Sequence, residues 1–238
     1  MGAAFSSKVA AEARAILWVA TGCDPDDSTT WTRPVSSGSI RLRFTKRQTQ
    51  PPCIQHSTSL WAKVGGCRGA DSEHLLLAFH PAEEPGDDGW HIEVSFAYEK
   101  PDFMEWRANV HRKGRALLML FLFSDVGIHD SSTRIRVGSH IDTARQLAPA
   151  KEAGLTLREL TSDGFAGSAH RLEQLATGPA GKVYLCHPFL VHSAYKDYGK
   201  QPRFIAQPPL LPREPISLER SDNSYSPVEK TILRALGR

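Results

Sequence analysis

Short apolar runs separated by turn residues recur through the sequence from residue 74 to residue 210. The runs are rich in Val, Ile, Phe and Leu, and clusters of Gly, Pro and Asp lie between them. Strand-sized runs bounded by such turn residues are typical of an antiparallel sandwich or barrel. We therefore expect a mainly β fold whose interior can bind a small ligand. The expected strands are His74–His80, Gly89–Phe96, Arg115–Phe123, Thr133–Val137, Leu155–Leu160, Lys182–His192 and Arg203–Leu210.

Three other segments have helical character. Apolar residues recur at helical spacing over Ala10–Ala20, which predicts an amphipathic surface helix that stops at Gly22. Shorter helices are predicted over Asp142–Glu152 and Ala169–Ala176. The expected fold is thus mainly β with flanking helices.

The length suits one domain. The chain has 238 residues and shows no internal repeat and no low-complexity linker, which favours a single domain over residues 1–238. Within it we expect a helical and loop-rich N-terminal flank at 1–73, a β-barrel core at 74–211 and a C-terminal tail at 212–238.

Composition limits the class of partner. With 40% hydrophobic and 23% charged residues, the chain is neither disordered nor membrane-embedded in character. The net charge is only +3 and the basic residues are scattered, so we expect neither a nucleic-acid partner nor a membrane partner. Four irregularly spaced cysteines are typical of reduced thiols in a cytoplasmic protein. The oligomeric state has no signal in the sequence.

Common catalytic signatures are absent from the sequence, including the phosphate-binding loop, the G-x-G-x-x-G turn, H-E-x-x-H and G-x-S-x-G. The sequence does have ten histidines. Of these, His91 precedes Glu93 by two positions on an expected strand, so both side chains would project from one face, about 7 Å apart at Cα. They would supply two of the three ligands of a 2-His-1-carboxylate site for Fe(II). The alternative is a surface histidine beside a solvated glutamate.

A second metal histidine would have to come from a distant strand. His187 and His192 lie in one long apolar run, and their spacing of five places them on opposite faces of a regular strand. At most one of them would therefore face a metal. Arg203 follows and opens the last expected strand, where its planar guanidinium could bind a dicarboxylate through two parallel hydrogen bonds. The alternative is an ordinary surface arginine.

Three segments, taken in order, resemble the phytanoyl-CoA dioxygenase family. They are Gly89–Glu93, Thr133–His140, and His187–His192 followed by Pro202-Arg203. The likeness covers about Gly86 to Leu211. It implies a double-stranded β-helix, which is a jelly-roll or cupin-like barrel. It also implies an Fe(II)- and 2-oxoglutarate-dependent dioxygenase that uses O₂ to oxidise a small organic molecule, most simply by hydroxylation, while 2-oxoglutarate becomes succinate and CO₂.

The resemblance assigns roles residue by residue. His91 and His192 match the family's metal histidines, and Arg203 matches the residue that pairs with the distal carboxylate of 2-oxoglutarate. Glu93 stands where the family usually has Asp, so its carboxylate is one methylene farther from the backbone. His91, Glu93 and His192 are therefore the expected metal-binding and catalytic set. Gly138-Ser139-His140 resembles a family turn that is structural or lines the pocket.

Two alternatives follow from the same residues. Because Glu93 replaces Asp, the protein could be a catalytically impaired barrel of this family that binds a ligand without turnover. A metal other than iron, held by the same ligands, could instead support hydrolytic or isomerase chemistry. Arg203 argues against the second alternative, since water-only chemistry needs no dicarboxylate clamp.

The remaining features have simpler interpretations. The polar, aromatic-dotted segment Lys100–Lys113 lies between two expected strands, a usual place for a lid that sets substrate choice. Cys53-x-x-His56 with Cys67 lacks a fourth zinc ligand at proper spacing. We expect the other histidines to be structural or exposed, and His187 to pack beside the site rather than ligate the metal.

Overall fold

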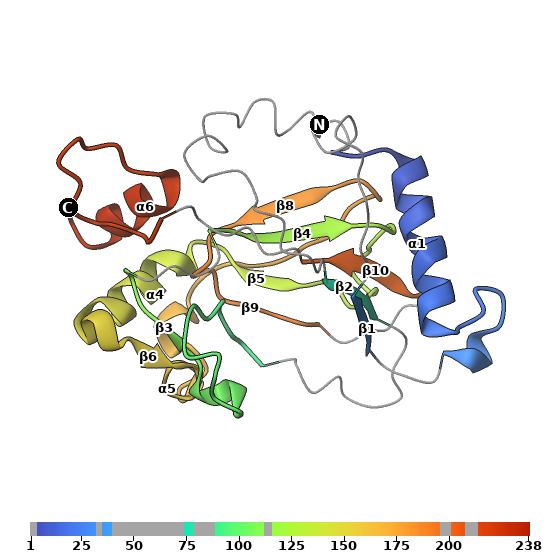
Figure 1. The fold of residues 1–238 in the computed structure, drawn as a ribbon, viewed down its shortest axis with the longest axis horizontal. Helices are drawn as coiled ribbons and strands as arrows, with labels where there is room; N and C mark the ends of the chain where they lie inside the picture. The colour runs from blue at the N-terminus through green and yellow to red at the C-terminus, as the bar shows by residue number, and fades with distance from the viewer. Residues whose placement is uncertain are drawn as a thin grey trace.

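The computed structural model of the protein describes residues 4–31, 35–39, 74–78, 89–111, 116–195, 201–207 and 214–238. Within these residues the strands form three antiparallel sheets (Figure 1). The five-stranded sheet has the order β1 (Val35–Ser39), β2 (His74–Ala78), β10 (Arg203–Ala206), β4 (Leu118–Leu122), β8 (Val183–Cys186). The three-stranded sheet has the order β7 (Glu173–Leu175), β5 (Arg134–Arg136), β9 (His192–Ser193). The two-stranded sheet pairs β3 (Arg107–Ala108) with β6 (Leu155–Thr156).

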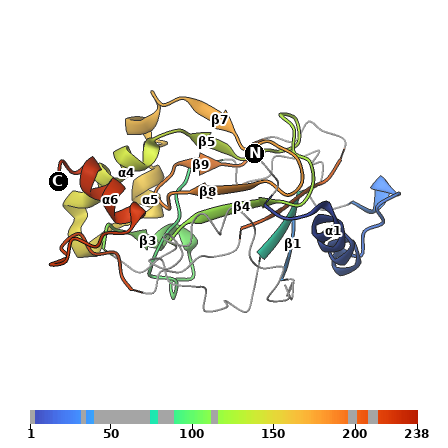
Figure 2. The same cartoon turned by 90° about the horizontal axis from the view of Figure 1, so that it is seen from above.

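The two larger sheets lie next to each other (Figure 2), and they share a buried core. Alternate residues of β4, Leu118 and Leu120, are buried in one cluster with Ile135 of β5. Because side chains alternate across a strand, these residues define the inner face of the five-stranded sheet, which is turned toward β5. The space between the two sheets is therefore the interior in which a ligand was expected.

The opposite face of the five-stranded sheet is covered by α1 (Ser7–Thr21). Ala13 and Leu17 of this helix pack against Phe123 and Phe204. The Ser6 side chain caps the first turn, and Gly22 ends the helix in the left-handed conformation at φ 70°, a conformation that glycine adopts without steric penalty. The predicted helix and its stop are confirmed. A short 3-10 turn, η1 (Ser28–Thr30), follows.

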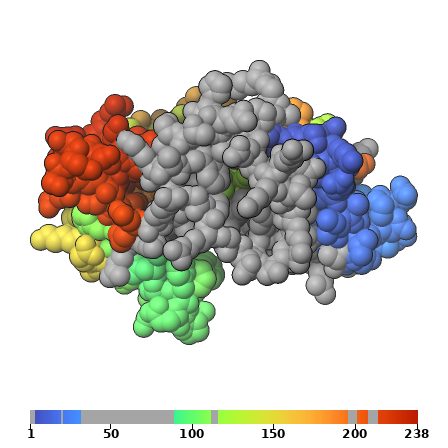
Figure 3. Space-filling model, turned by 45° about the horizontal axis from the view of Figure 1, so that its top comes forward, coloured from blue at the N-terminus to red at the C-terminus, as the bar shows by residue number. Residues whose placement is uncertain are grey.

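Several helices pack together at the other end of the molecule: α4 (Ser139–Leu147), η3 (Ala148–Ala153), α5 (Leu157–Thr161) and α6 (Pro227–Ala235). Leu147 of α4 and Ile232 of α6 are buried in one cluster with Ile92 and Val191. The helix predicted over Asp142–Glu152 is present, but it begins earlier, as α4, and its last part is the 3-10 helix η3. Figure 3 shows α1 and α6 at opposite ends of one face.

One predicted helix and one predicted strand are wrong. Ala169–Ala176 contains a turn and strand β7, which follow η4 (Ala166–Ser168), and β7 pairs with β5 along its whole length. Here strand pairing with a distant segment overrides local helix propensity. The run Leu155–Leu160 has only two strand residues before α5 begins. The reason is a capping box in which Thr156 and Glu159 satisfy each other's backbone N–H groups.

The long run Lys182–His192 divides into two strands of different sheets, β8 and β9. Pro188 has no N–H to donate to a ladder, and the chain turns there, with Leu190 N donating to His187 O at 2.9 Å. The five-residue spacing of His187 and His192 therefore does not decide which faces they occupy.

Gly89–Phe96 is not a continuous strand. Its backbone changes partner along the way: His91 pairs with His192, Glu93 N donates to Pro188 O, and Phe96 pairs with Arg107. Ala97 then takes a positive φ of 66°. Regular strand alternation therefore does not by itself establish that Glu93 lies on the face of His91, and that placement stays a prediction.

The other expected strands appear as β2, β4, β5 and β10. Residues 79–80, 115 and 208–210 of those runs lie outside the described residues, as do Cys53, His56 and Cys67. The antiparallel, sheet-rich fold with flanking helices is confirmed, while a closed barrel stays a prediction. Within the described ranges, no helix is both long enough and apolar enough to cross a bilayer.

Candidate functional site

His91 and His192 lie directly opposite each other. Their backbones exchange two hydrogen bonds, from His91 N to His192 O at 2.9 Å and from His192 N to His91 O at 3.0 Å. Residues paired in this way share a face, and the two ring centroids are 4.4 Å apart with their planes at 61°. Ile135 pairs with His192 on the other side, so both imidazoles lie on the inner face, with His192 only 3% exposed.

Each imidazole is held by the backbone two residues before it. The Nδ1 atoms of His91 and His192 lie 2.9 Å from the carbonyl oxygens of Gly89 and Leu190, respectively. Because a carbonyl oxygen can only accept, Nδ1 carries the proton and Nε2 carries the lone pair. Metal-binding histidines are commonly oriented by such a hydrogen bond, so these two residues fit the ligand chemistry of a divalent metal.

Arg203 approaches the same interior from the five-stranded sheet. Its neighbours Phe204 and Ala206 pack on the α1 side, while Ile205 packs with Leu122 and Val126 on the inner side. Alternation along β10 therefore places Arg203 on the inner face with Ile205. Its side chain is buried, with the residue 8% exposed. A permanently charged fork in this position suits a carboxylate ligand.

Glu93 is half-buried, and its N–H donates to Pro188 O at 3.2 Å. Over the described parts of the chain, no three His, Cys, Asp or Glu side chains gather in an arrangement that could hold a metal ion. The structure thus brings the two predicted histidines together, and Glu93 as the third ligand stays a prediction.

The other two histidines near the site have a packing role. The rings of His140 and His187 stack 4.9 Å apart, and Phe189 N donates to His187 Nδ1 at 3.1 Å. Burial lowers the pKa of His187 to about 3, and burial also lowers the pKa of His140. Both rings are therefore neutral near pH 7, as a packed imidazole pair requires.

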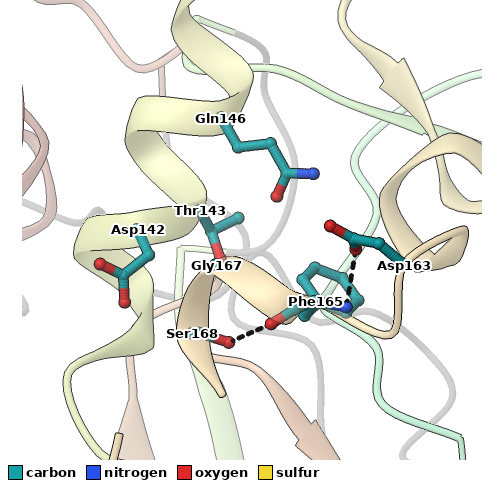
Figure 4. A pocket seen from close by; sticks show the side chains of 7 residues that line it. All are labelled: Asp142, Thr143, Gln146, Asp163, Phe165, Gly167 and Ser168. Carbon is teal, nitrogen blue, oxygen red and sulfur yellow. Dashed lines mark hydrogen bonds between the residues drawn. The ribbon is translucent and has the colours of Figure 1, made fainter. Parts of the chain in front are cut away.

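A pocket of about 230 Å³ lies between α4 and the segment that contains η4 (Figure 4). Asp142 in its wall makes two hydrogen bonds to Arg171, at 2.8 and 2.9 Å, which lower the pKa of that carboxyl. None of the predicted site residues lines this pocket. The lining residues are Asp142, Thr143, Gln146, Asp163, Phe165, Gly167 and Ser168.

The expected lid contains η2 (Phe103–Glu105) and strand β3, and its green segment projects from the body in Figure 3. Arg158 of α5 ties it down through Asp102 at 2.7 Å and Glu105 at 2.9 Å. Trp106 and Tyr98 meet edge to face with ring centroids 5.0 Å apart. Residues 112 and 113 lie outside the described residues. The role of the segment Lys100–Lys113 as a lid stays a prediction.

Sequence reasoning missed a cluster of side chains on the outer face behind the two histidines. Trp90 lies under the guanidinium groups of Arg134 and Arg136, whose Cζ atoms are 4.7 and 4.1 Å from its ring centroid. The sequence does contain a pattern that indicates this cluster. In β5, arginine alternates with isoleucine, which places two positive charges on the face opposite Ile135.

No protein-family model matches the sequence, and none of the curated proteins matches it. Among solved structures, HygX from Streptomyces hygroscopicus with nickel, 2-oxoglutarate and hygromycin B bound is similar at a TM-score of 0.46 and 16% identity, over 87% of this chain and 79% of that chain. The nickel complex of ThoJ, a non-heme monooxygenase, gives 0.44 and 15% over 90% and 74%. A Pseudomonas putida prolyl-4-hydroxylase gives 0.41 and 12% over 90% and 91%. With every TM-score below 0.5, these likenesses establish neither a shared fold nor a shared activity.

Proposed function

We propose that the protein is an Fe(II)- and 2-oxoglutarate-dependent dioxygenase with a jelly-roll barrel that oxidises a small organic molecule. The observation that carries the proposal is the pairing of His91 with His192 on the inner face, with both Nδ1 atoms held by carbonyl oxygens. Arg203 faces the same interior from the opposite sheet. Two imidazoles and a buried guanidinium are what a metal-chelated dicarboxylate would need.

His91 and His192 would hold the metal through Nε2, and Glu93 would supply a carboxylate oxygen. Bound Fe(II) supplies the O₂ chemistry that couples conversion of 2-oxoglutarate to succinate and CO₂ with oxidation of the substrate. The hydrogen bonds from Nδ1 to Gly89 O and Leu190 O keep the rings in the tautomer that coordinates and fix their direction.

Arg203 would bind and orient 2-oxoglutarate through the carboxylate that does not touch the metal. Its planar fork matches a carboxylate in two parallel hydrogen bonds, and burial strengthens them by excluding water. Leu122 and Ile205 on the same inner face are 2% exposed. These apolar side chains would keep water away from the reacting groups and would leave Arg203 as the polar partner for the cosubstrate on this face.

The proposal treats residues 1–238 as one catalytic domain, with 1–73 as a flank, 74–211 as the barrel and 212–238 as a tail. Helix α6 of that tail packs on α4, where Arg145 Nε donates to Ala235 O at 2.9 Å. The partners would be a small-molecule substrate and O₂ in the cytoplasm, with no nucleic acid and no membrane.

The test is an anaerobic titration of the purified full chain with Fe(II) and then 2-oxoglutarate, followed by the visible absorption of the complex. We expect both to bind, and His192→Ala to abolish metal binding. Absence of metal binding in the wild-type protein would overturn the proposal.

Glu93 has its own test in the same titration. If the site is built around the longer carboxylate, Glu93→Asp lowers metal affinity and Glu93→Gln lowers it further. A large gain of iron affinity or of succinate formation in Glu93→Asp would instead identify a native site that is disabled for turnover.

A further inference from the structure

One side chain, Arg134, contacts the neighbour of each paired histidine. Its Cζ lies 4.7 Å from the ring centroid of Trp90, which directly precedes His91. Its Nε donates to Ser193 Oγ at 2.9 Å, and Ser193 directly follows His192. Arg134 thus spans both histidine segments on the face opposite the imidazoles, since Ser193 pairs with it across β9.

Further contacts keep this arrangement in place. The Tyr195 ring lies on the guanidinium of Arg134, with 5.5 Å between Cζ and the ring centroid. Arg136, two residues along β5, places its Cζ 4.1 Å from the Trp90 centroid. Aromatic faces attract guanidinium groups through their quadrupole, and the attraction grows when water is excluded. Trp90 is therefore held by two charges from one strand.

Arg136 anchors the cluster to the body of the protein. Its Nη1 donates to Gly164 O at 3.2 Å, to Phe165 O at 2.9 Å and to Ser168 Oγ at 3.2 Å. Phe165 and Ser168 also form a wall of the pocket in Figure 4, where Ser168 Oγ donates to Phe165 O. Arg136 thereby fixes the position of Trp90 relative to η4. Arg134, which contacts both Trp90 and Ser193, fixes β9 relative to Trp90.

The backbone alone constrains the histidines weakly. His91 belongs to a single isolated bridge, and His192 belongs to a strand of two residues. Such a short ladder leaves the angle between the two segments to side-chain packing. Arg134 links these two segments, because it contacts Trp90 beside His91 and Ser193 beside His192.

We propose that Arg134 is a positioning residue that holds the His91 and His192 imidazoles in the relative orientation that one shared metal ion requires. The inference rests on the proposed function, in which these two histidines bind the metal. It assigns Arg134 no contact with metal, cosubstrate or substrate.

The test measures Co(II) affinity of the full chain and the visible absorption spectrum of the Co(II) form. Arg134→Met removes the charge and the hydrogen-bonding fork but keeps the length of the side chain. We expect it to weaken Co(II) binding by about 10- to 100-fold, the range seen when groups that orient metal ligands are removed. The spectrum should change as well, because it reports ligand geometry.

Two variants separate the contacts. Arg134→Lys keeps a charge over Trp90 but loses the planar fork, so it should recover part of the affinity. Ser193→Ala removes the hydroxyl that accepts from Arg134 Nε and donates to Ala194 O, and should weaken Co(II) binding by a smaller factor. The matched control is Arg145→Met, since Arg145 Nε also donates at 2.9 Å to an oxygen of another element, Ala235 O, away from the histidines.

The outcomes are distinct. If the wild-type protein binds no Co(II), Fe(II) or Ni(II), the proposed function fails. If the wild type binds metal and Arg134→Met, Arg134→Lys and Ser193→Ala bind it equally well with unchanged spectra, the positioning role is overturned and the proposed function stands. A lower melting temperature of Arg134→Met with unchanged metal affinity also overturns it. Where Arg134→Met does not fold, the Arg134→Lys and Ser193→Ala pair decides in the same way.

Discussion

Strand β10 and the two histidine segments hold their side chains by different means. Arg203 begins a strand that is paired on both sides, with β2 and β4, and whose four residues are all buried. His91 and His192 rest on one isolated bridge and a two-residue strand. In β10 the backbone ladder sets the direction of each side chain. In the histidine segments, contacts between side chains such as Arg134 and Trp90 also help to set the direction of the imidazoles.

The largest effect is expected from Arg203→Met, which tests whether the β10 ladder holds the strand without its guanidinium. Because the ladder of β10 does not need the guanidinium, the strand and the metal histidines should survive. Affinity for 2-oxoglutarate should fall by roughly 1,000-fold, or about 4 kcal/mol, since the distal carboxylate loses its buried guanidinium partner. Calorimetric titration of the Ni(II)-loaded protein measures it, with Arg203→Lys as the partial-rescue variant. Unchanged affinity in Arg203→Met would remove Arg203 from the site.

A second change tests how much the inner face of β10 contributes to folding. Ile205 is 2% exposed, so Ile205→Ala should lower the free energy of unfolding by about 3 kcal/mol through lost burial and a residual cavity. Leu172→Ala is the control, because Leu172 is 73% exposed and its truncation should change stability by less than about 0.5 kcal/mol. Urea unfolding measures both. Equal effects would contradict the inner-face assignment.

The turn between β8 and β9 provides a third, pH-dependent test. Burial lowers the pKa of His187 to about 3 in the folded protein, against about 6.5 when unfolded. As pH falls below 6.5, the unfolded chain takes up this proton first, so folding stability falls. From pH 7 to pH 4.5 the group should remove about 2 to 3 kcal/mol of folding stability.

His187→Asn retains an acceptor for Phe189 N but does not titrate, so its unfolding free energy should depend less on pH over that range. Urea unfolding at the two pH values makes the comparison. Some dependence should remain, since burial also lowers the pKa of His140. Identical pH dependence in wild type and His187→Asn would contradict a buried, neutral His187.

The smallest expected effect concerns α5, which replaces a predicted strand. Thr156→Ala removes the hydroxyl that accepts from Glu159 N at 3.1 Å, and should lower the free energy of unfolding by about 1 kcal/mol. Thr156→Ser keeps the cap and should remain close to wild type. Thermal unfolding measures the difference. Equal stability of the Ala and Ser variants would mean that the capping box does not hold this helix.

Periodic and locally capped segments were predictable from the sequence. Helix α1 follows from apolar spacing and Gly22, and β4 and β10 follow from apolar runs that pair over most of their length. The segment that became β7 was not predictable, because its strand state depends on pairing with β5, far away in the sequence. Local propensity contains no information about such a partner.

The candidate site divides in the same way. Residue type and spacing single out His91 and Arg203, and the family resemblance adds His192; the structure places the two histidines together and Arg203 on the inner face. The placement of Glu93 relied on strand alternation and stays a prediction, because the backbone changes partner after His91 and the segment is not a regular strand. The contact of Trp90 with Arg134 arises only from tertiary structure and has no counterpart in sequence spacing.

The packing of α1 on β10 also has a consequence for how the chain acquires its structure. Leu17 of α1 packs with Phe204 of β10, which lies far along the chain from it. A newly made α1 must therefore wait, with its apolar stripe exposed, until β10 has been synthesised. Contacts between such distant segments slow folding and lengthen exposure to aggregation. Since Arg203 occupies the opposite face of the same strand, the proposed dicarboxylate site cannot form before β10 has paired with its neighbours.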